Sequence, residues 1–551
     1  MIDGNSAVAL DRHTRHTPWP DRFLTLAALA TVLAVLAPIL VVMLSWGSDQ
    51  TETWQHLIAT QLSGLLRNTL VLLVGVSVGV ALLGVSLAWL TVMCEFPGRR
   101  WLDWGLMLPM AVPAYVLAFV ALGLLDFAGP LQQGLRGWLG PGFQVVDIRG
   151  DFTVIAVLVL VLYPYVYMLA RSAFLAQGSD VLEAARVLGC NSYGAFFRVA
   201  LPMARPAIVA GVSLAAMETL ADFGAVAIFN YDTFTTAIYK AWFGLFNLQA
   251  AAQLASLLLI FVAFVLYLER YSRGRSRYTQ GARLQHLHRY PLRGGLGWAA
   301  LAYAGTVMLL AFVIPLLQLL VWALDDRAAL LGGRFLMLTG HTLLLAGLGV
   351  VLTLLLALVM ALGQRRSRGV LHSFFGIARL GYALPGSVLA VGVVLSFAQL
   401  DHWLVVPVQE WLGVARPTLL VGSVLALLAA YWVRFLAVAS GPLDAALDRI
   451  RPSIPEAARS LGARGRELWW RIYLPMLRPG LLTAGVLVFV DIMKEMPATL
   501  LLRPFGWDTL AVRIYELTSE GEWKRAALPA LVLVLVGLGP VIIALRRSAQ
   551  R

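Results

Sequence analysis

Residues 183–206 read EAARVLGCNSYGAFFRVALPMARP, and residues 456–479 read EAARSLGARGRELWWRIYLPMLRP. Twelve of the 24 positions are identical when Glu183 is aligned with Glu456 without gaps. The similarity continues outside these stretches, because NTL at 68–70 corresponds to HTL at 341–343 in the same ungapped alignment. The sequence therefore predicts that the chain consists of two halves with the same structure.

The composition identifies the class of protein to which these halves belong. Hydrophobic residues make up 60% of the 551 residues and charged residues only 13%. A soluble domain is closer to half apolar and a quarter charged, so this balance excludes a soluble, a disordered or a disulfide-rich protein. A helix that crosses a bilayer needs about 20 apolar residues. Runs of this kind predict an all-α polytopic membrane protein with twelve spans, at 22–46, 66–94, 104–125, 153–176, 204–229, 247–269, 296–324, 339–363, 373–400, 417–440, 478–502 and 526–545.

Each half contains six of these spans in the same orientation. Two such six-helix repeats are predicted to be related by a pseudo-twofold axis along the membrane normal. The predicted divisions of the chain are a cytoplasmic tail at 1–21, a first membrane half at 22–269, an Arg-rich cytoplasmic linker at 270–295, a second membrane half at 296–545 and a cytoplasmic tail at 546–551.

The arginines set the orientation of the spans. Alternate loops are rich in arginine, including 171–205, 270–295 and 441–478, whereas the other loops carry more acidic residues. Basic loops stay in the cytoplasm, so both termini are predicted to be cytoplasmic, as an even number of spans also requires. This rule explains the net charge of +13 without a nucleic-acid partner. No Gly-Lys pair occurs, which excludes a P-loop ATPase in this chain.

The segment that matches best between the halves lies in cytoplasmic loops, which indicates a surface that contacts another protein. Each Glu-Ala-Ala is expected to begin a short helix, each glycine to permit a turn, and each Leu-Pro to end the loop. The aromatic pairs at 196–197 and 469–470 are expected to pack the loops against the spans. A loop that packs only on itself is the alternative. The residues predicted to contact the partner are Glu183, Ala184, Ala185, Gly189, Pro202, Glu456, Ala457, Ala458, Gly462 and Pro475.

This pattern resembles the EAA motif, the signature loop of binding-protein-dependent ABC importer permeases. Both copies have the family's spacing from Glu to Gly to Pro, with mild departures at Val199 and Cys190 of the first copy. The stretches 112–119, 218–229, 233–243 and 491–516 are similar to the fused permeases for ferric iron. The resemblance extends from about residue 60 to residue 545.

The resemblance implies the fold of type I ABC importer permeases in the bacterial inner membrane. It implies Fe³⁺ as the substrate, handed over by a periplasmic binding protein. It also implies a separate ATPase in two copies, one beneath each repeated loop, which binds the ATP and Mg²⁺. The chain itself is then a transport subunit without catalytic residues, without a cofactor and without a tightly bound metal.

Charged residues inside the predicted spans are candidates for the translocation pathway. Glu218 and Asp222 are four residues apart, as are Asp491 and Glu495, so each pair is expected to share one helix face. At 1.5 Å per residue the first pair lies about 18 and 24 Å above Pro206, in the middle to outer half of the membrane. Carboxylate oxygens suit a hard cation such as Fe³⁺. Alternatively these carboxylates are satisfied within the helix bundle, and Lys494 could neutralise one of them.

Two other functions remain open on the sequence alone. The same signature loop occurs in permeases for thiamine, polyamines and sulfate, so the substrate is less firmly indicated than the family. A cation-coupled secondary transporter could also use internal repeats and buried carboxylates. It would have no need of two matched cytoplasmic docking loops.

Overall fold

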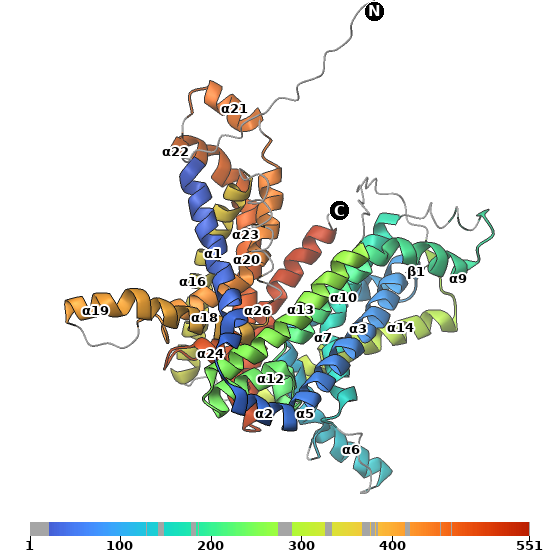
Figure 1. Cartoon of the computed structure of the whole chain (residues 1–551). Coiled ribbons are helices and arrows are strands. Elements are labelled where there is room, and N and C mark those ends of the chain that lie inside the picture. The colour runs from blue at the N-terminus through green and yellow to red at the C-terminus, as the bar shows by residue number, and fades with distance from the viewer. Residues whose placement is uncertain are drawn as a thin grey trace, which may run out of the picture.

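Among the residues that it describes, the computed structural model contains 12 helices that are long and apolar enough to cross a membrane, the number that the sequence predicts. Figure 1 shows the helical architecture. The structure describes residues 21–127, 129–140, 148–177, 183, 185, 187–273, 289–325, 333–365, 375, 381, 384–413, 419–451, 453–463 and 465–549. Most of the linker and of the N-terminal tail therefore lies outside the described residues, whereas residues 546–549 of the predicted C-terminal tail are helical.

The described residues of each half form helices and one two-residue strand; η denotes a 3-10 or π-helical segment. The first half contains α1 (Asp21–Leu44), η1 (Ser45–Gly47), α2 (Thr51–Thr60), α3 (Leu62–Met93), β1 (Cys94–Glu95), α4 (Arg99–Gly105), η2 (Leu108–Ala111), α5 (Ala114–Leu125), α6 (Pro130–Leu139), α7 (Asp151–Gln177), α9 (Ser192–Ala195), η3 (Phe196–Ala200), α10 (Leu201–Ala221), α11 (Gly224–Ile228), α12 (Phe234–Tyr239), η4 (Lys240–Gly244) and α13 (Leu248–Arg273). The second half contains β2 (Tyr290–Pro291), α14 (Gly295–Met308), η5 (Leu309–Val313), α15 (Ile314–Asp325), α16 (Gly333–Gln364), α18 (Gly386–Leu400), η8 (Asp401–Val405), α19 (Val406–Leu412), α20 (Val424–Asp448), α21 (Ser453–Ser460), α22 (Gly465–Leu468), η9 (Trp469–Tyr473), α23 (Leu474–Lys494), α24 (Pro497–Leu502), α25 (Leu510–Ser519) and α26 (Trp523–Ala549).

The alignment of the sequence repeat recurs in the fold. The helices α7 and α20 begin at equivalent residues of the repeat, Asp151 and Val424. The segment formed by η3 and α10 likewise begins and ends at residues equivalent to those that bound η9 and α23. The repeated loop and the span after it therefore have the same local structure in both halves.

Three predicted spans are not the single helices that the sequence suggested. The span expected at 104–125 is divided, because η2 ends at Ala111 and α5 begins after Pro113, whose ring fixes φ and removes a backbone donor. The spans expected at 204–229 and 478–502 end early, because α10 stops at Ala221 and α23 stops at Lys494.

The first span of each half packs against the other half. The helix α1 contacts α16 and α18, while α15 contacts α5 as well as α26 of its own half. Glycines allow both close approaches. A Cβ atom at Gly392 of α18 would lie 2.6 Å from the carbonyl oxygen of Pro38, and one at Gly123 of α5 would lie 2.6 Å from the Trp322 ring. The two halves are therefore interlocked rather than merely side by side.

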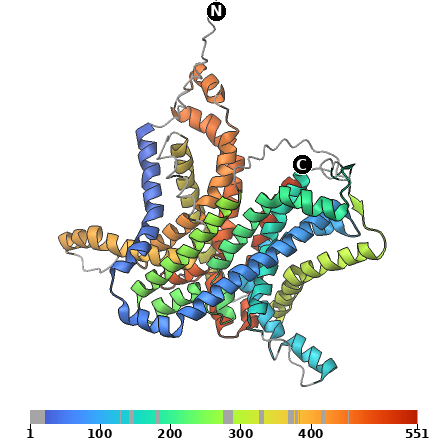
Figure 2. The ribbon, with the colours of Figure 1, turned by 45° about the vertical axis from the view of Figure 1, so that its right-hand side comes forward.

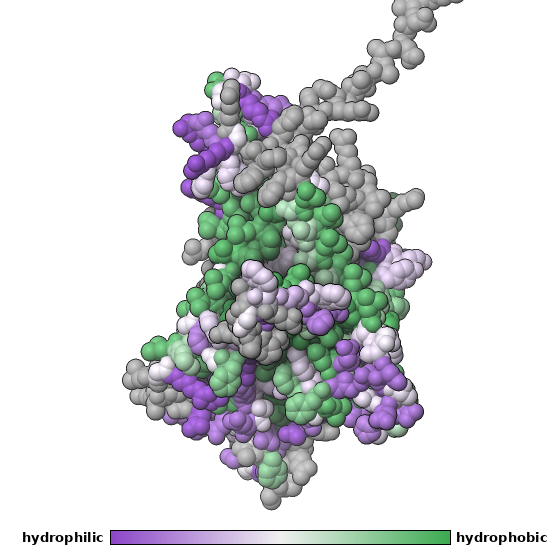
Figure 3. All heavy atoms as spheres, turned by 60° about the vertical axis from the view of Figure 1, so that its left-hand side comes forward, coloured by the Kyte–Doolittle hydropathy of each residue, from purple (hydrophilic) through white to green (hydrophobic). Residues whose placement is uncertain are grey.

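The spans diverge toward the end of the molecule that carries α21 and α9, and they converge at the opposite end, near α2 and α12 (Figures 1 and 2). The described chain begins and ends toward the first of these ends, as an even number of spans requires. Figure 3 shows apolar atoms across the middle of one face, with hydrophilic residues gathered above and below them. Leucines and valines are also exposed elsewhere along the spans, for example Val78, Leu82, Leu355 and Leu482, as expected for side chains that face lipid.

A two-stranded parallel sheet attaches the start of the second half to the first half. Strand β2 pairs in parallel with β1, so that Tyr290 lies opposite Cys94. Beside the strands, Arg99 donates a hydrogen bond of 2.9 Å to Glu95. Arg289 donates one of 3.2 Å to the carbonyl oxygen of Val92. These contacts fix the point at which the chain enters α14.

Candidate functional site

The two repeated loops lie at the same end of the molecule (Figure 1). In the second loop, Glu456, Ala457 and Ala458 form part of α21. In the first loop Glu183 and Ala185 are helical, whereas the predicted contact residue Ala184 lies outside the described residues. Gly189 and Gly462 have φ values of +88° and +92°, which L side chains rarely adopt. Each loop thus turns at the glycine before the chain re-enters a helix.

One aromatic residue of each pair anchors its loop, and the other faces outward. Phe196 packs on Trp89 of α3 with ring centroids 4.6 Å apart, and Trp469 stacks on Tyr473 at 5.9 Å. Phe197 and Trp470 are 61% and 57% exposed. The acidic residues, the glycines and the prolines of both copies are exposed as well, namely Glu183, Gly189, Pro202, Glu456, Gly462 and Pro475. Each loop therefore presents a mixed polar and apolar surface.

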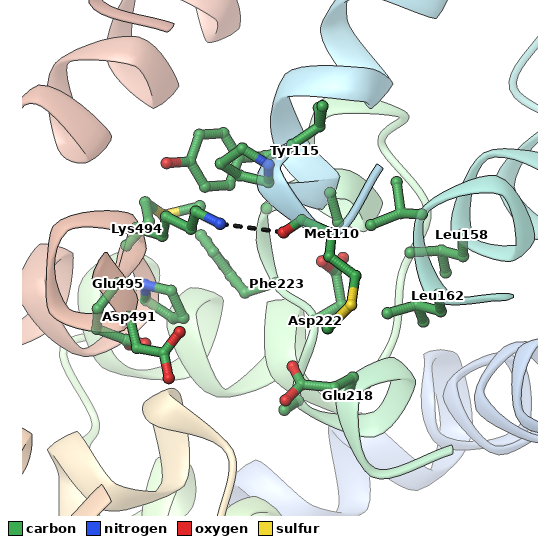
Figure 4. A pocket seen from close by; sticks show the side chains of 18 of the residues that line it. Met110, Tyr115, Leu158, Leu162, Glu218, Asp222, Phe223, Asp491, Lys494 and Glu495 are labelled. Atoms are coloured by element: carbon green, nitrogen blue, oxygen red, sulfur yellow. Dashed lines mark hydrogen bonds between the residues drawn. The ribbon is translucent and has the colours of Figure 1, made fainter. Parts of the chain in front are cut away.

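A cavity of about 180 Å³ lies between the two halves, and it brings together all five residues predicted for the pathway (Figure 4). The first half contributes Glu218 and Asp222 to its lining, and the second half contributes Asp491, Lys494 and Glu495. Residues of η2, α7 and α20, and residues at the starts of α5, α11 and α24, complete the lining. The structure therefore gathers acidic residues from both halves around one space.

The expectation that each carboxylate pair shares a helix face is wrong. Asp222 and Glu495 are the first residues beyond α10 and α23, and their extended backbone (ψ of 128° and 113°) ends each helix. The side chains then bind the next short helix. Asp222 accepts a hydrogen bond of 3.1 Å from the backbone N–H of Val226, and Glu495 accepts one of 3.0 Å from Ala498. A carboxylate that satisfies otherwise unpaired N–H groups at a helix start stabilises the break.

The cationic partner of Glu495 in the cavity is an arginine that the sequence analysis did not single out. Glu495 forms an ion pair with Arg434 of α20 (Nε to Oε2, 3.1 Å), and both side chains are nearly buried. Lys494 instead donates a hydrogen bond of 3.1 Å to the carbonyl oxygen of Met110, in the first half (Figure 4). Arg434, rather than Lys494, therefore balances the charge of Glu495.

The comparisons with known proteins fit this architecture. Residues 80–273 match the model of the family described as binding-protein-dependent transport system inner membrane component. A probable sulfate transport system permease protein from Chlorokybus atmophyticus is 30% identical over 235 residues, which cover 41% of this chain and 76% of the relative.

The chain belongs to this family of ABC importer permeases.

Other relatives of the permease extend along most of its length. The Fe(3+)-transport system permease protein FbpB 2 of Haemophilus influenzae is 27% identical over 533 residues, which cover 95% of this chain and 98% of the relative. The ferric transport system permease protein FbpB of Actinobacillus pleuropneumoniae is 23% identical over 79% of this chain and 64% of the relative. The match over nearly full length shows that both halves of the permease have counterparts in a single related chain.

Arg434 is the main site residue that the sequence analysis did not identify. A signal was available, because an arginine within the apolar run YWVRFLAV is an intramembrane charge and thus a functional candidate. The sequence does not, however, indicate which residues surround Arg434 in the folded permease. A Cβ atom at Gly386 would lie 2.5 Å from Nη1 of Arg434 and 2.6 Å from Oε1 of Glu495. The absence of a side chain at Gly386 therefore makes room for the ion pair.

The carboxylates of the cavity do not form a metal centre of the usual kind. Among the residues that the structure describes, no group of three or more His, Cys, Asp or Glu side chains has a geometry that could hold a metal ion. The arrangement can attract a cation electrostatically and let it pass, because a path must release its ion as readily as it accepts it.

Proposed function

We propose that the permease forms the pathway for ferric iron in an ABC importer, with iron delivered by a periplasmic binding protein and ATP hydrolysed by two copies of a separate ATPase. The observation that carries this proposal is the cavity between the halves, which four carboxylates line. Carboxylate oxygens are hard ligands and favour hard cations. The extended similarity to permeases named for Fe(3+) or ferric transport supports the same substrate.

The structure suggests how the ATPase would act on this cavity. In each half the repeated loop leads through a π-helical turn directly into the span that carries the cavity carboxylate, from Leu201 to Glu218 and from Leu474 to Asp491. Seventeen residues at 1.5 Å each separate the two ends, a distance of about 26 Å. A displacement of either loop by a bound ATPase would therefore reach the cavity through one continuous helix.

The acidic residues of the cavity argue against an anionic substrate. Some relatives are named for sulfate or molybdenum transport. In this permease the cavity carries four carboxylates against Arg434 and Lys494. An oxyanion would meet a net negative lining, which disfavours its entry. A cation-coupled secondary transporter would leave the two matched loops without a role.

Reconstitution tests the proposal directly. The permease, its ATPase and its binding protein are placed in proteoliposomes, and ATP-dependent uptake of labelled Fe³⁺ is compared with that of thiamine, spermidine, sulfate and molybdate. We expect uptake of Fe³⁺ alone, and only when both ATP and the binding protein are present. Uptake of another substrate in its place, or uptake driven by an ion gradient without ATP, would refute the proposal.

A further inference from the structure

The two walls of the cavity differ in charge. The second half contributes two carboxylates, Asp491 and Glu495, and two cations, Arg434 and Lys494, so its formal charges cancel. The first half contributes Glu218 and Asp222, and none of the described residues with which it lines the cavity is an arginine or a lysine. The excess negative charge of the cavity therefore belongs to the wall of the first half.

One position in the repeat is responsible for much of this difference. In the alignment of the two halves, Val161 and Leu162 of α7 correspond to Arg434 and Phe435 of α20, and all four line the cavity. Leu162 and Phe435 are both apolar, whereas the buried Val161 corresponds to a guanidinium group. At equivalent positions of the fold, the first wall thus has the apolar Val161 and the second wall has the cationic Arg434. The carboxylates Asp222 and Glu495, which follow the equivalent helices α10 and α23, also line the cavity.

The contacts around Arg434 show a site built to hold it in place. Its Nε lies 3.1 Å from Glu495 Oε2, and the other carboxylate oxygen, Oε1, accepts the backbone N–H of Ala498 at 3.0 Å. The guanidinium also lies 5.9 Å from the ring centroid of Phe435, within the range of a cation–π contact. Gly386 leaves the space that both partners occupy. Arg434 and Glu495 are therefore mutually fixed.

We propose that Arg434 is a specificity-determining residue that keeps the wall of the second half neutral, so that the transported cation passes along the wall of the first half, over Glu218 and Asp222. This inference rests on the proposed function, because it assumes a cationic substrate. A cation is attracted more strongly to the wall whose lining residues sum to a net negative charge. The two halves, although built alike, then contribute unequally to the pathway.

Substitution at Val161 provides the first test. Val161→Arg gives the first wall the cation that the second wall already has, while Val161→Met adds an apolar side chain of similar length. In proteoliposomes with the ATPase and the binding protein, we expect Val161→Arg to lower Fe³⁺ uptake by about tenfold or more, because the acidic wall loses its attraction for the ion. We expect Val161→Met to lower uptake much less than Val161→Arg does, because it adds bulk to the wall without adding charge. Equal uptake by both variants would overturn the proposal.

A second series remains informative if Val161→Arg fails to fold. Glu495→Gln keeps an acceptor for the N–H of Ala498 but leaves Arg434 unbalanced, whereas Arg434→Met with Glu495→Gln removes both charges. Uptake is expressed per assembled complex, measured by size-exclusion chromatography and by stimulated ATPase activity. We expect several-fold lower uptake per assembled complex for Glu495→Gln and recovery in the double variant. Normal uptake per assembled Glu495→Gln complex would show that the pair only stabilises the fold and would overturn the proposal.

The wild-type protein separates this inference from the function on which it rests. If the wild type takes up no Fe³⁺ but another substrate, the proposed function fails. If it takes up Fe³⁺ while Val161→Arg matches Val161→Met, only the role assigned to Arg434 fails.

Discussion

Nζ of Lys494, in the second half, donates a hydrogen bond of 3.1 Å to the backbone carbonyl oxygen of Met110, in the first half. Lys494 is the last residue of α23, and Met110 lies in η2 just before α5. Gly537 of α26 leaves space for this contact, because a Cβ atom there would lie 2.9 Å from Cε of Lys494. The contact thus joins the two halves at the edge of the cavity.

Loss of this contact should destabilise the folded permease. A hydrogen bond to a charged group stabilises a protein by about 1.5–3 kcal/mol, so we expect Lys494→Met to lower the melting temperature in detergent by several degrees. Lys524→Met is the matched control, because Lys524 pairs with Asp325 at an exposed position, where such pairs contribute little. Equal melting temperatures for the two variants would show that the bond between the halves is unimportant.

The repeated loops should be required for coupling to the ATPase. We expect the double variant Glu183→Ala with Glu456→Ala to lose copurification of the ATPase and ATP-dependent uptake while the spans still insert, since both side chains are exposed on the proposed contact surface. Bulky residues at Ala185, which is buried, and at Ala458, which is half-buried, should have the same effect because they would distort the loops. Glu52→Ala in α2, near the opposite end of the molecule, serves as the control. Normal ATPase binding and transport by the double variant would exclude this role.

The arginine distribution predicts the orientation of the permease. Reporter fusions at residue 280, in the linker, and at residue 551, at the C-terminus, should both give a cytoplasmic signal, because basic loops remain on that side of the membrane. A fusion within the acidic loop before α7 should give the opposite signal. A periplasmic reporter signal at residue 280 or 551 would contradict the twelve-span topology.

The two carboxylate pairs should respond differently to neutralisation. Glu218 and Asp491 lie within α10 and α23, so Glu218→Gln with Asp491→Asn should markedly lower Fe³⁺ uptake without loss of ATPase binding. Asp222→Asn with Glu495→Gln should lower the yield of folded protein in addition to lowering uptake, because Arg434 would remain buried without its ion pair. Uptake and size-exclusion profiles measured together distinguish the two effects. Unchanged uptake by the first double variant would assign these carboxylates a purely structural role.

The segment 503–516, outside the spans, should confer a pH-dependent stability. Partial burial alone would raise the pKa of Glu516, but hydrogen bonds from Arg503 (2.7 Å) and Arg513 (3.1 Å) outweigh it and lower this pKa. A lowered pKa stabilises the fold above the unfolded value of about 4.3, and this stabilisation is lost as the pH falls through the folded value.

We therefore expect Glu516→Gln to lower the melting temperature at pH 7, and the difference from the wild type to disappear on acidification below about pH 4. Glu520→Gln, at an exposed position four residues after Glu516, should leave the melting temperature unchanged at both pH values. A difference for Glu516→Gln that persists at low pH would refute the electrostatic explanation.

The sequence could predict those features that depend on apolar run length and on repetition. The number of spans, the duplication and the presence of one loop motif in each half follow directly from the residues. The ends of α10 and α23 could not be predicted in this way, because the runs around Asp222 and Glu495 stay apolar after the helix has ended. There the carboxylate binds backbone groups of the next helix, a contact that hydrophobicity does not report.

Contacts between distant parts of the chain could not be predicted from the sequence either. Arg434 and Glu495 belong to different spans, and the space that they share depends on Gly386, in a third span. Lys494 bonds to a backbone carbonyl, which no residue type reveals. The sequence therefore identified the acidic residues of the cavity, but not which of them are balanced by a cation.

The exchange of first spans, with α1 against α18 and α15 against α5, has a consequence for how this protein can evolve. Because the first span of each half packs against the other half, the two halves of one chain behave as the subunits of an obligate heterodimer with fixed stoichiometry. Neither half ever has to assemble with a copy of itself. The two halves can therefore carry different residues at equivalent positions, which a symmetric homodimer cannot, and Val161 and Arg434 are one such pair.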